Sequence, residues 1–175
     1  MEGMDPLAVL AESRLLPLLT VRGGEDLLGL ARVLEEEGVG ALEITLRTEK
    51  GLEALKALRK SGLLLGAGTV RSPKEAEAAL EAGAAFLVSP GLLEEVAALA
   101  QARGVPYLPG VLTPTEVERA LALGLSALKF FPAEPFQGAR VLKAYADVFP
   151  EVRLLPTGGI SPWGRTPTGP ASATT

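Results

Sequence analysis

The stretch GLSALKFFPAE (Gly124–Glu134) places a glycine at the end of a helical segment and an apolar strand directly after it. The same arrangement recurs along the chain, with a glycine every 20 to 24 residues at Gly38, Gly62, Gly83, Gly104 and Gly124. Glycine is typical of helix C-termini, and an apolar run follows each of these glycines at a nearly constant offset. The chain is therefore predicted to repeat a strand–helix unit, which implies a parallel sheet covered by helices.

Seven apolar runs are candidate strands. They are Leu15–Val21, Ala41–Arg47, Leu63–Thr69, Ala85–Pro90, Tyr107–Val111, Ala127–Ala133 and Arg153–Gly158. Because the units are regular and their strands buried, we predict an α/β fold that closes as a (β/α)8 TIM barrel. An open doubly wound sheet is the alternative. No G-x-G-x-x-G sequence opens the first helix, which weakens the dinucleotide-binding form of that alternative.

Composition restricts the classes of function. The 175 residues are 47% hydrophobic with a formal net charge of −4, which predicts one domain with a substantial core and argues against a nucleic-acid partner. No apolar run approaches the length of a membrane span, so we expect no membrane partner and a cytoplasmic location. Cysteine and histidine are absent, which excludes thiolate and Ser-His-Asp catalysis. The lack of Asn suggests a heat-adapted source, although GC-rich coding gives a similar composition.

Polar and apolar residues alternate along the second candidate strand. Leu42, Ile44 and Leu46 are predicted to face the helices, because side chains on a strand alternate between its two faces. Glu43, Thr45 and Arg47 are then predicted to face inward. An exposed strand with one wet face is the alternative, but it fits poorly in a sheet covered on both sides.

Lys129 occupies the same place in its unit as Glu43, five residues after the unit glycine. Alternate strands of a barrel fill one interior layer, so the ammonium and the carboxylate are predicted to approach each other across the barrel. The other five lysines lie among charged or helix-forming neighbours. Lys129 alone lies in an apolar strand, where burial favours a neutral, nucleophilic amine that forms imines with carbonyl compounds. A snorkelling lysine or a structural ion pair is the alternative.

Small residues end several candidate strands, in Gly66–Thr69, Ser89–Gly91 and Pro109–Gly110. They are predicted to let a substrate approach the backbone at the carboxyl ends of the strands, where barrel active sites lie. Pro156–Ser161 contains a Gly-Gly pair after the seventh strand. Barrels frequently bind phosphate at this place through backbone N–H groups.

Five motifs occur in order: LEITLRT (Leu42–Thr48), GAGTV (Gly66–Val70), VSPG (Val88–Gly91), LKFFPAE (Leu128–Glu134) and PTGGISP (Pro156–Pro162). In sequence and spacing the chain resembles the 2-keto-3-deoxy-6-phosphogluconate (KDPG)/4-hydroxy-2-oxoglutarate (KHG) aldolase family over about residues 8–163. The resemblance implies a class I aldolase on a (β/α)8 barrel that needs no metal or other cofactor. It also implies a homotrimer that acts on small 2-oxo acids.

The resemblance also implies roles for particular residues. Lys129 corresponds to the Schiff-base lysine and Glu43 to the acid/base. The substrate-binding positions are Arg47 for the carboxylate, Thr69, Pro90 and Phe131 around the pyruvate pocket, and Gly158 and Gly159 for phosphate. Two other functions stay open: a catalytically impaired remnant that binds phosphosugars or oxo acids, and a different phosphate-binding barrel. The sequence around Lys129 does not favour the latter.

The end of the chain departs from the family pattern. After Trp163 the family continues into a seventh helix, an eighth strand and a final helix, whereas Gly164–Thr175 has no apolar periodicity. We therefore expect an incomplete barrel domain over residues 1–163 that lacks strand eight. Residues 164–175 are interpreted as a linker, a disordered segment or the product of an altered reading frame.

Overall fold

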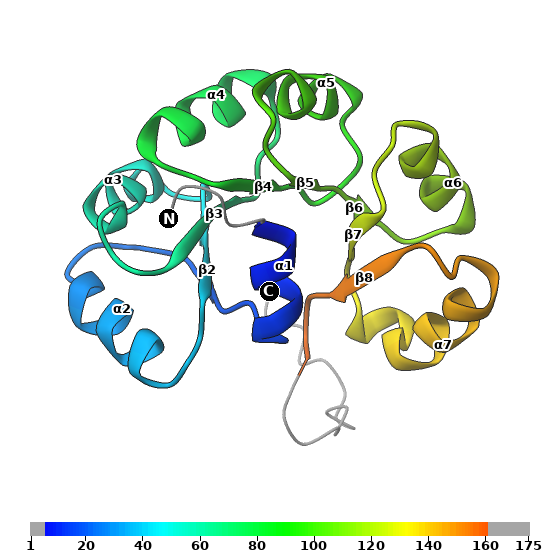
Figure 1. The fold of residues 1–175 in the computed structure, drawn as a ribbon, viewed down its shortest axis with the longest axis horizontal. Helices are drawn as coiled ribbons and strands as arrows, with labels where there is room; N and C mark the ends of the chain where they lie inside the picture. The colour runs from blue at the N-terminus through cyan, green and yellow to red at the C-terminus, as the bar shows by residue number, and fades with distance from the viewer. Residues whose placement is uncertain (1–5, 161–175) are drawn as a thin grey trace, which may run out of the picture.

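The computed structural model describes residues 6–160, which form alternating strands and helices around a barrel axis (Figure 1). The strands are β1 (Leu18–Leu19), β2 (Ala41–Thr45), β3 (Leu64–Gly68), β4 (Phe86–Val88), β5 (Tyr107–Leu108), β6 (Gly110–Val111), β7 (Ala127–Phe130) and β8 (Arg153–Pro156). The helices are α1 (Pro6–Ser13), α2 (Leu27–Glu36), α3 (Lys50–Leu58), α4 (Pro73–Ala82), α5 (Glu94–Arg103), α6 (Pro114–Ala122) and α7 (Gly138–Val148), with a short 3-10 turn η1 (Glu134–Phe136).

Local sequence accounts for the ends of several helices. The Ser72 side chain caps α4 by accepting a hydrogen bond from the Glu75 N–H, and Thr113 and Glu116 form a reciprocal capping box at the start of α6. Proline occupies the first turn of both helices, where no N–H is needed. Helices α4 and α5 end in left-handed glycines, Gly83 and Gly104, as the glycine repeat predicted.

All strand pairs are parallel, and they form two sheets. One contains β1 to β5 in sequence order, and the other contains β6, β7 and β8. The predicted strand Tyr107–Val111 is divided into β5 and β6 at Pro109, because proline has no N–H to donate to a ladder. The labelled strands therefore occupy the seven predicted positions, and the parallel α/β architecture is confirmed.

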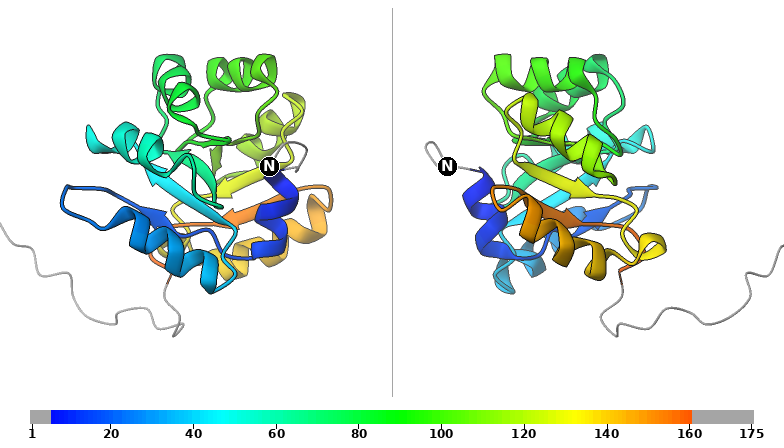
Figure 2. Two further views of the ribbon diagram at one scale, coloured as in Figure 1. Left: turned by 60° about the vertical axis from the view of Figure 1, so that its left-hand side comes forward. Right: turned by 90° about the vertical axis from the view of Figure 1, so that its right-hand side faces the viewer.

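Alternation along the strands separates two apolar layers. Leu42 and Ile44 belong to the layer between the strands and the surrounding helices, which lie outside the strands in the views of Figure 2. Val88 lies in a second cluster with residues of the barrel interior and of α1. Glu43 and Thr45 are buried on the opposite face of β2 from Leu42 and Ile44, as the alternation predicted.

Helix α1 was not predicted from the sequence, because its apolar residues do not concentrate on one face. Its Leu7, Val9 and Leu10 pack against Ala41 and Leu64, the first residues of β2 and β3, so α1 covers the amino-terminal end of the barrel. A cavity of about 540 Å³ lies there between α1 and β8, which are neighbours in Figure 1.

Some expectations concern parts of the chain that the structure does not describe. The residues 164–175 lie outside the described range, as does the end of the expected domain at residue 163. Among residues 6–160, β1 and β8 are each an edge strand of a different sheet, and no pairing joins them. No helix in this range combines the length and the apolar character that crossing a membrane requires.

Candidate active site

Glu43 and Lys129 meet inside the barrel from opposite strands. Lys129 Nζ lies 3.7 Å from Glu43 Oε1, and the two side chains are only 5% and 2% exposed. This distance is too long for a hydrogen bond but short enough for strong electrostatic interaction in a buried environment. The predicted approach of these two groups across the barrel is confirmed, and their catalytic roles stay predictions.

The Glu43 carboxyl is under-solvated. Burial raises its pKa above the usual value, and the opposing effect of the nearby Lys129 amine offsets this only in part. Its Oε1 atom is buried without a hydrogen-bond partner among the described residues. A buried carboxyl with a free oxygen and a raised pKa is suited to accept and return a proton.

Gly68 makes the position of the Glu43 carboxyl possible. The Glu43 side chain occupies the place where a Cβ at position 68 would lie. Small residues at this strand end were predicted to make room for substrate. The structure shows that the room at Gly68 holds the carboxyl itself, because the side chain from β2 crosses over the backbone of the neighbouring strand β3.

Lys129 is surrounded by groups from three strand ends. Gly110 is its partner in the β6–β7 register, and the Pro90 carbonyl from the loop after β4 fills the place of a Cβ at Gly110. The ring of Phe131 lies under the amine, with 5.3 Å between Nζ and the ring centroid. Phe131 is thus beside the amine, and the Pro90 carbonyl lies next to Gly110, the register partner of Lys129. The predicted place of both residues around the pyruvate pocket stays a prediction.

Arg47 lies at the mouth of the barrel and not inside it. Strand β2 ends at Thr45, so Arg47 falls in the following turn and is exposed, in contrast to the inward position predicted for it. Its Nε donates a hydrogen bond to Thr69 Oγ1 at 3.3 Å. Thr69 has a φ of +59°, which is unfavourable for a β-branched residue and is typical of functional sites.

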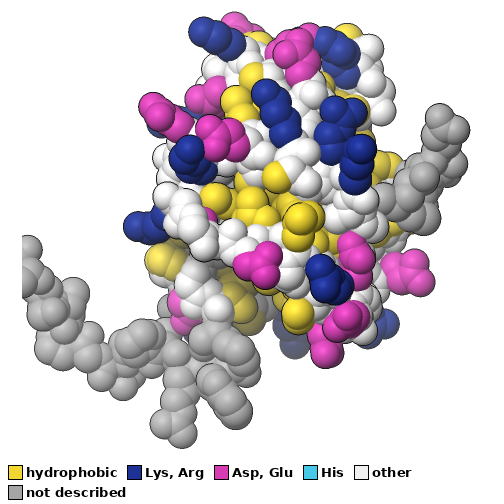
Figure 3. All heavy atoms as spheres, turned by 90° about the vertical axis from the view of Figure 1, so that its left-hand side faces the viewer, with side chains coloured by type: hydrophobic (Ala, Val, Ile, Leu, Met, Phe, Trp, Pro, Cys, Tyr) yellow, Lys and Arg dark blue, Asp and Glu magenta, His cyan; other side chains and the backbone are white. Residues whose placement is uncertain are grey.

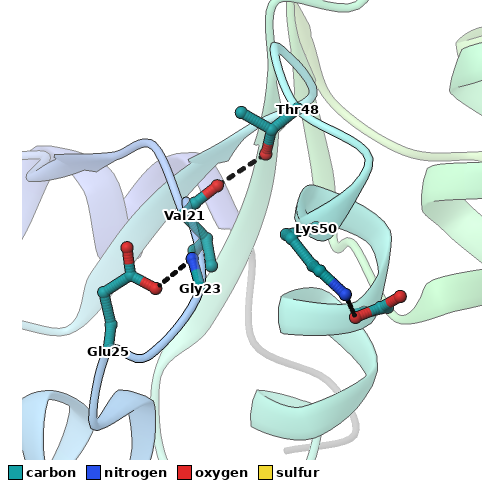
Figure 4. A network of polar contacts seen from close by, with 6 residues as sticks. Val21, Gly23, Glu25, Thr48 and Lys50 are labelled. Carbon is teal, nitrogen blue, oxygen red and sulfur yellow. Dashed lines mark hydrogen bonds and ion pairs between the residues drawn. The ribbon is translucent and has the colours of Figure 1, made fainter.

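Two threonine bonds tie the loop of Arg47 to the neighbouring strand end. Thr48 Oγ1 donates a hydrogen bond to the Val21 carbonyl at 2.6 Å, as Figure 4 shows. Closer to the barrel interior, the hydroxyl oxygens of Thr20 and Thr45 are 2.9 Å apart. Thr20 and Thr48 were not predicted to contribute, because their partners lie on another strand and leave no local pattern in the sequence.

A buried hydroxyl pair supports the loop that carries Pro90. Ser89 Oγ lies 2.6 Å from Tyr107 Oη, and the Tyr107 hydroxyl accepts a hydrogen bond from the Leu93 N–H. Ser89 also donates to the Gly91 carbonyl. The Tyr107 side chain of β5 therefore holds the turn Ser89–Gly91 in place. The small residues of this turn were predicted to let a substrate approach the backbone, and the supporting tyrosine was not predicted.

Gly158 and Gly159 follow β8 at the same end of the barrel as Lys129. Both have positive φ values, +100° and +75°. The Gly158 carbonyl accepts a hydrogen bond from the Glu134 N–H, and the Thr157 carbonyl accepts one from Ala133. The Gly-Gly loop is thus joined by backbone bonds to the loop after β7. Among residues 6–160, no group of three or more acidic side chains is placed to hold a metal ion.

An α/β barrel with a lysine–glutamate pair buried at its carboxyl end belongs to a recognisable class, the barrel lyases that work through an amine. Comparison with known proteins identifies the member of this class. The family model for KDPG and KHG aldolase matches residues 7–166, and the chain belongs to this family.

Individual relatives agree with this assignment. A 2-dehydro-3-deoxy-phosphogluconate aldolase from Treponema pallidum is 44% identical over 149 residues, which is 84% of this chain and 71% of the relative. A solved structure of a 4-hydroxy-2-oxoglutarate/2-dehydro-3-deoxyphosphogluconate aldolase from TTHB1 is 97% identical, with a TM-score of 0.89 over 91% of this chain and 80% of that one.

A third relative bears on the chemistry. The KDPG aldolase of Legionella pneumophila, with pyruvate captured at low pH as a covalent carbinolamine intermediate, is 39% identical to this chain. Its TM-score is 0.82, over 90% of this chain and 77% of that structure. These neighbours confirm the barrel fold that the sequence predicted.

We predict that Glu43→Gln changes the pH dependence of stability. From about pH 4.5 up to the raised pKa of Glu43, the folded state binds more protons than the unfolded state. The free energy of unfolding of the wild type should therefore fall with rising pH in this window, relative to a variant that carries no ionisable group at position 43. Urea unfolding at a series of pH values measures this difference.

Glu116→Gln is the matched control, because it should show the opposite sign. Partial burial alone would raise the pKa of Glu116, but hydrogen bonds from the N–H groups of Thr113 and Leu112 lower it overall. The wild type should then lose its advantage over this variant as the pH falls. The same sign for both variants would contradict the assignment of a raised pKa to Glu43.

Proposed function

We propose that the chain is a class I aldolase that cleaves KDPG to pyruvate and glyceraldehyde 3-phosphate, or KHG to pyruvate and glyoxylate, through an imine on Lys129. The observation that carries the proposal is the buried Lys129–Glu43 pair at the carboxyl end of the barrel. The names of the relatives and the carbinolamine in the Legionella pneumophila enzyme support the substrate and the class of chemistry.

The reaction begins at the Lys129 amine. Its lone pair attacks the C2 carbonyl carbon of the 2-oxo acid, and the oxygen leaves as water, which produces a protonated imine. The imine nitrogen withdraws electrons from C3, so the C3–C4 bond breaks as the C4 hydroxyl loses its proton and the aldehyde departs. The resulting enamine takes a proton at C3, and hydrolysis of the imine releases pyruvate.

Glu43 is the proposed acid/base in these steps. It takes the proton of the C4 hydroxyl and returns a proton to C3. Its free Oε1 atom and its raised pKa suit both transfers. We expect the 3.7 Å separation from Lys129 to keep the carboxyl within reach of atoms bound to the amine.

The remaining residues are proposed to hold the two ends of the substrate. Arg47, oriented by its bond to Thr69, is placed to bind the carboxylate, for which a guanidinium is well suited. Pro90 and Phe131 border the pyruvate moiety. The backbone of Gly158 and Gly159 is proposed to bind the phosphate of a phosphorylated substrate.

The test of the proposal is reductive trapping. Protein incubated with pyruvate and borohydride should acquire one pyruvate adduct on the peptide that contains Lys129, and Lys129→Met should abolish it, because no amine remains to form the imine. Mass spectrometry of the digested protein measures the adduct. The exposed Lys143→Met is the control and should label like the wild type. A trapped protein without turnover of KDPG or KHG would support the impaired, binding-only alternative.

Arg47→Lys should raise the KM for the 2-oxo acid about tenfold or more with a smaller change in kcat, since a charge-assisted bond to the carboxylate is weakened. Steady-state kinetics with KDPG and KHG measures both constants. Arg71→Lys, an exposed arginine in the loop after β3, is the control. An unchanged KM for Arg47→Lys, or an equal rise in both variants, contradicts the proposed role.

We also propose that the protein is a cytoplasmic homotrimer. The proposal of a trimer rests on the family resemblance, and the proposal of the location rests on composition. Figure 3 shows apolar side chains gathered on the side of α2 and α3, with charged side chains around them. Leu28 and Val33 of α2 are among the exposed large apolar residues. Sedimentation equilibrium should give three times the chain mass of 18.1 kDa. A single-chain mass contradicts the trimer, and recovery in a membrane fraction contradicts the location.

A further inference from the structure

The Lys129 amine lies against the face of an aromatic ring. Nζ is 5.3 Å from the centroid of Phe131, within the range in which a cation is attracted by the negative face of the ring. Lys129 is only 4% exposed, so this attraction acts with little screening by water. Phe131 is half-buried and directly follows β7.

The ring also lies against the backbone of the Gly-Gly loop. Ring atoms of Phe131 lie 3.3 Å from the place of a Cβ at Gly158, whose φ of +100° also disfavours a side chain. The Phe131 N–H donates a hydrogen bond to the Val111 carbonyl, and Glu134 N–H donates one to Gly158. The ring therefore contacts the Gly-Gly loop as well as the amine.

Imine formation changes which group can balance the charge on the nitrogen. The neutral amine and a ketone combine with one proton and release one water, which leaves a single positive charge on the imine nitrogen. In the unreacted site, an ionised Glu43 can balance the ammonium. During the reaction Glu43 is proposed to carry a proton, and it is then uncharged. The ring keeps its negative face at every stage, because it has no proton to gain or lose.

We propose that the face of Phe131 is the constant electrostatic partner of the protonated imine on Lys129, beyond its role as an apolar wall of the pocket. This inference rests on the proposed function, since it concerns the imine of that reaction. An aromatic face stabilises a desolvated cation most when the negative potential above the ring is strongest. Withdrawing electrons from the ring should therefore weaken the imine in steps.

The test replaces Phe131 by 4-fluoro-, 3,5-difluoro- and 3,4,5-trifluorophenylalanine. The rings are nearly isosteric, so the pocket keeps its shape, while each fluorine removes part of the negative potential. The measured quantity is the rate at which pyruvate and cyanoborohydride, which reduces the protonated imine, label Lys129. We expect the rate to fall stepwise with fluorine number, by about tenfold at the trifluoro ring. If Phe131 acts only as an apolar wall, the labelling rate should not fall, because fluorination makes the ring more apolar.

Phe130 provides the matched control. It precedes Phe131 in the chain, is fully buried, and packs edge-to-face against Tyr145, with 6.1 Å between ring centroids. The same fluorinated series at Phe130 should leave the labelling rate within about twofold. Thermal unfolding of each protein separates a change in stability from a change in imine population.

The outcomes distinguish the inference from the function beneath it. A stepwise fall confined to the Phe131 series supports the inference. A flat Phe131 series, or an equal fall in both series, overturns it while trapping at Lys129 leaves the aldolase proposal intact. A wild-type protein that pyruvate does not label at Lys129 overturns both.

Discussion

The barrel interior holds a lysine and a glutamate side by side, away from solvent. Glu43 and Lys129 are both almost completely buried, and either one alone would be strongly unfavourable in that environment. Each is therefore less unfavourable beside the other, and β2 and β7 place the two groups close together in the interior. The neighbouring strand is constrained as well, because a side chain at Gly68 would occupy the space of the Glu43 carboxyl. The proposed catalytic geometry and the close packing of β2 against β3 thus involve the same glutamate side chain.

Glu43 and Lys129 are close together but not hydrogen-bonded, and this suits the proposed reaction. At 3.7 Å the two groups do not form a hydrogen bond, and Glu43 Oε1 stays unpartnered among the described residues. A tightly bonded ion pair would stabilise the resting protein but would engage the amine that is proposed to attack a carbonyl. Burial instead raises the pKa of the carboxyl and brings the proton-transfer group toward neutral pH. The surrounding loops supply the rigidity that the pair lacks, through bonds such as those from Thr48 to Val21 and from Tyr107 to Ser89.

The sequence predicted what local patterns control. The glycine repeat predicts the strands and the strand–helix order, and the constant offset from those glycines pairs Glu43 with Lys129. Period-two alternation assigned Leu42 and Glu43 to opposite faces correctly. Three features were missed. They are α1, whose apolar residues show no single face, the break of a strand at Pro109, and the turn that moves Arg47 to the mouth. The role of Gly68 was misread, since the side chain that fills its space comes from another strand.

The loops after β7 and β8 are joined by the backbone bonds Ala133 to Thr157 and Glu134 to Gly158. One of these loops begins beside the amine and the other carries the Gly-Gly pair, so the span between them is set by main chain and not by flexible side chains. If a substrate is anchored by its C2 carbon at one end and by a terminal anion at the other, this span works as a ruler. The fixed distance would then select substrates by the length of their carbon chain. A shorter substrate could bind at the amine but would not reach the Gly-Gly loop.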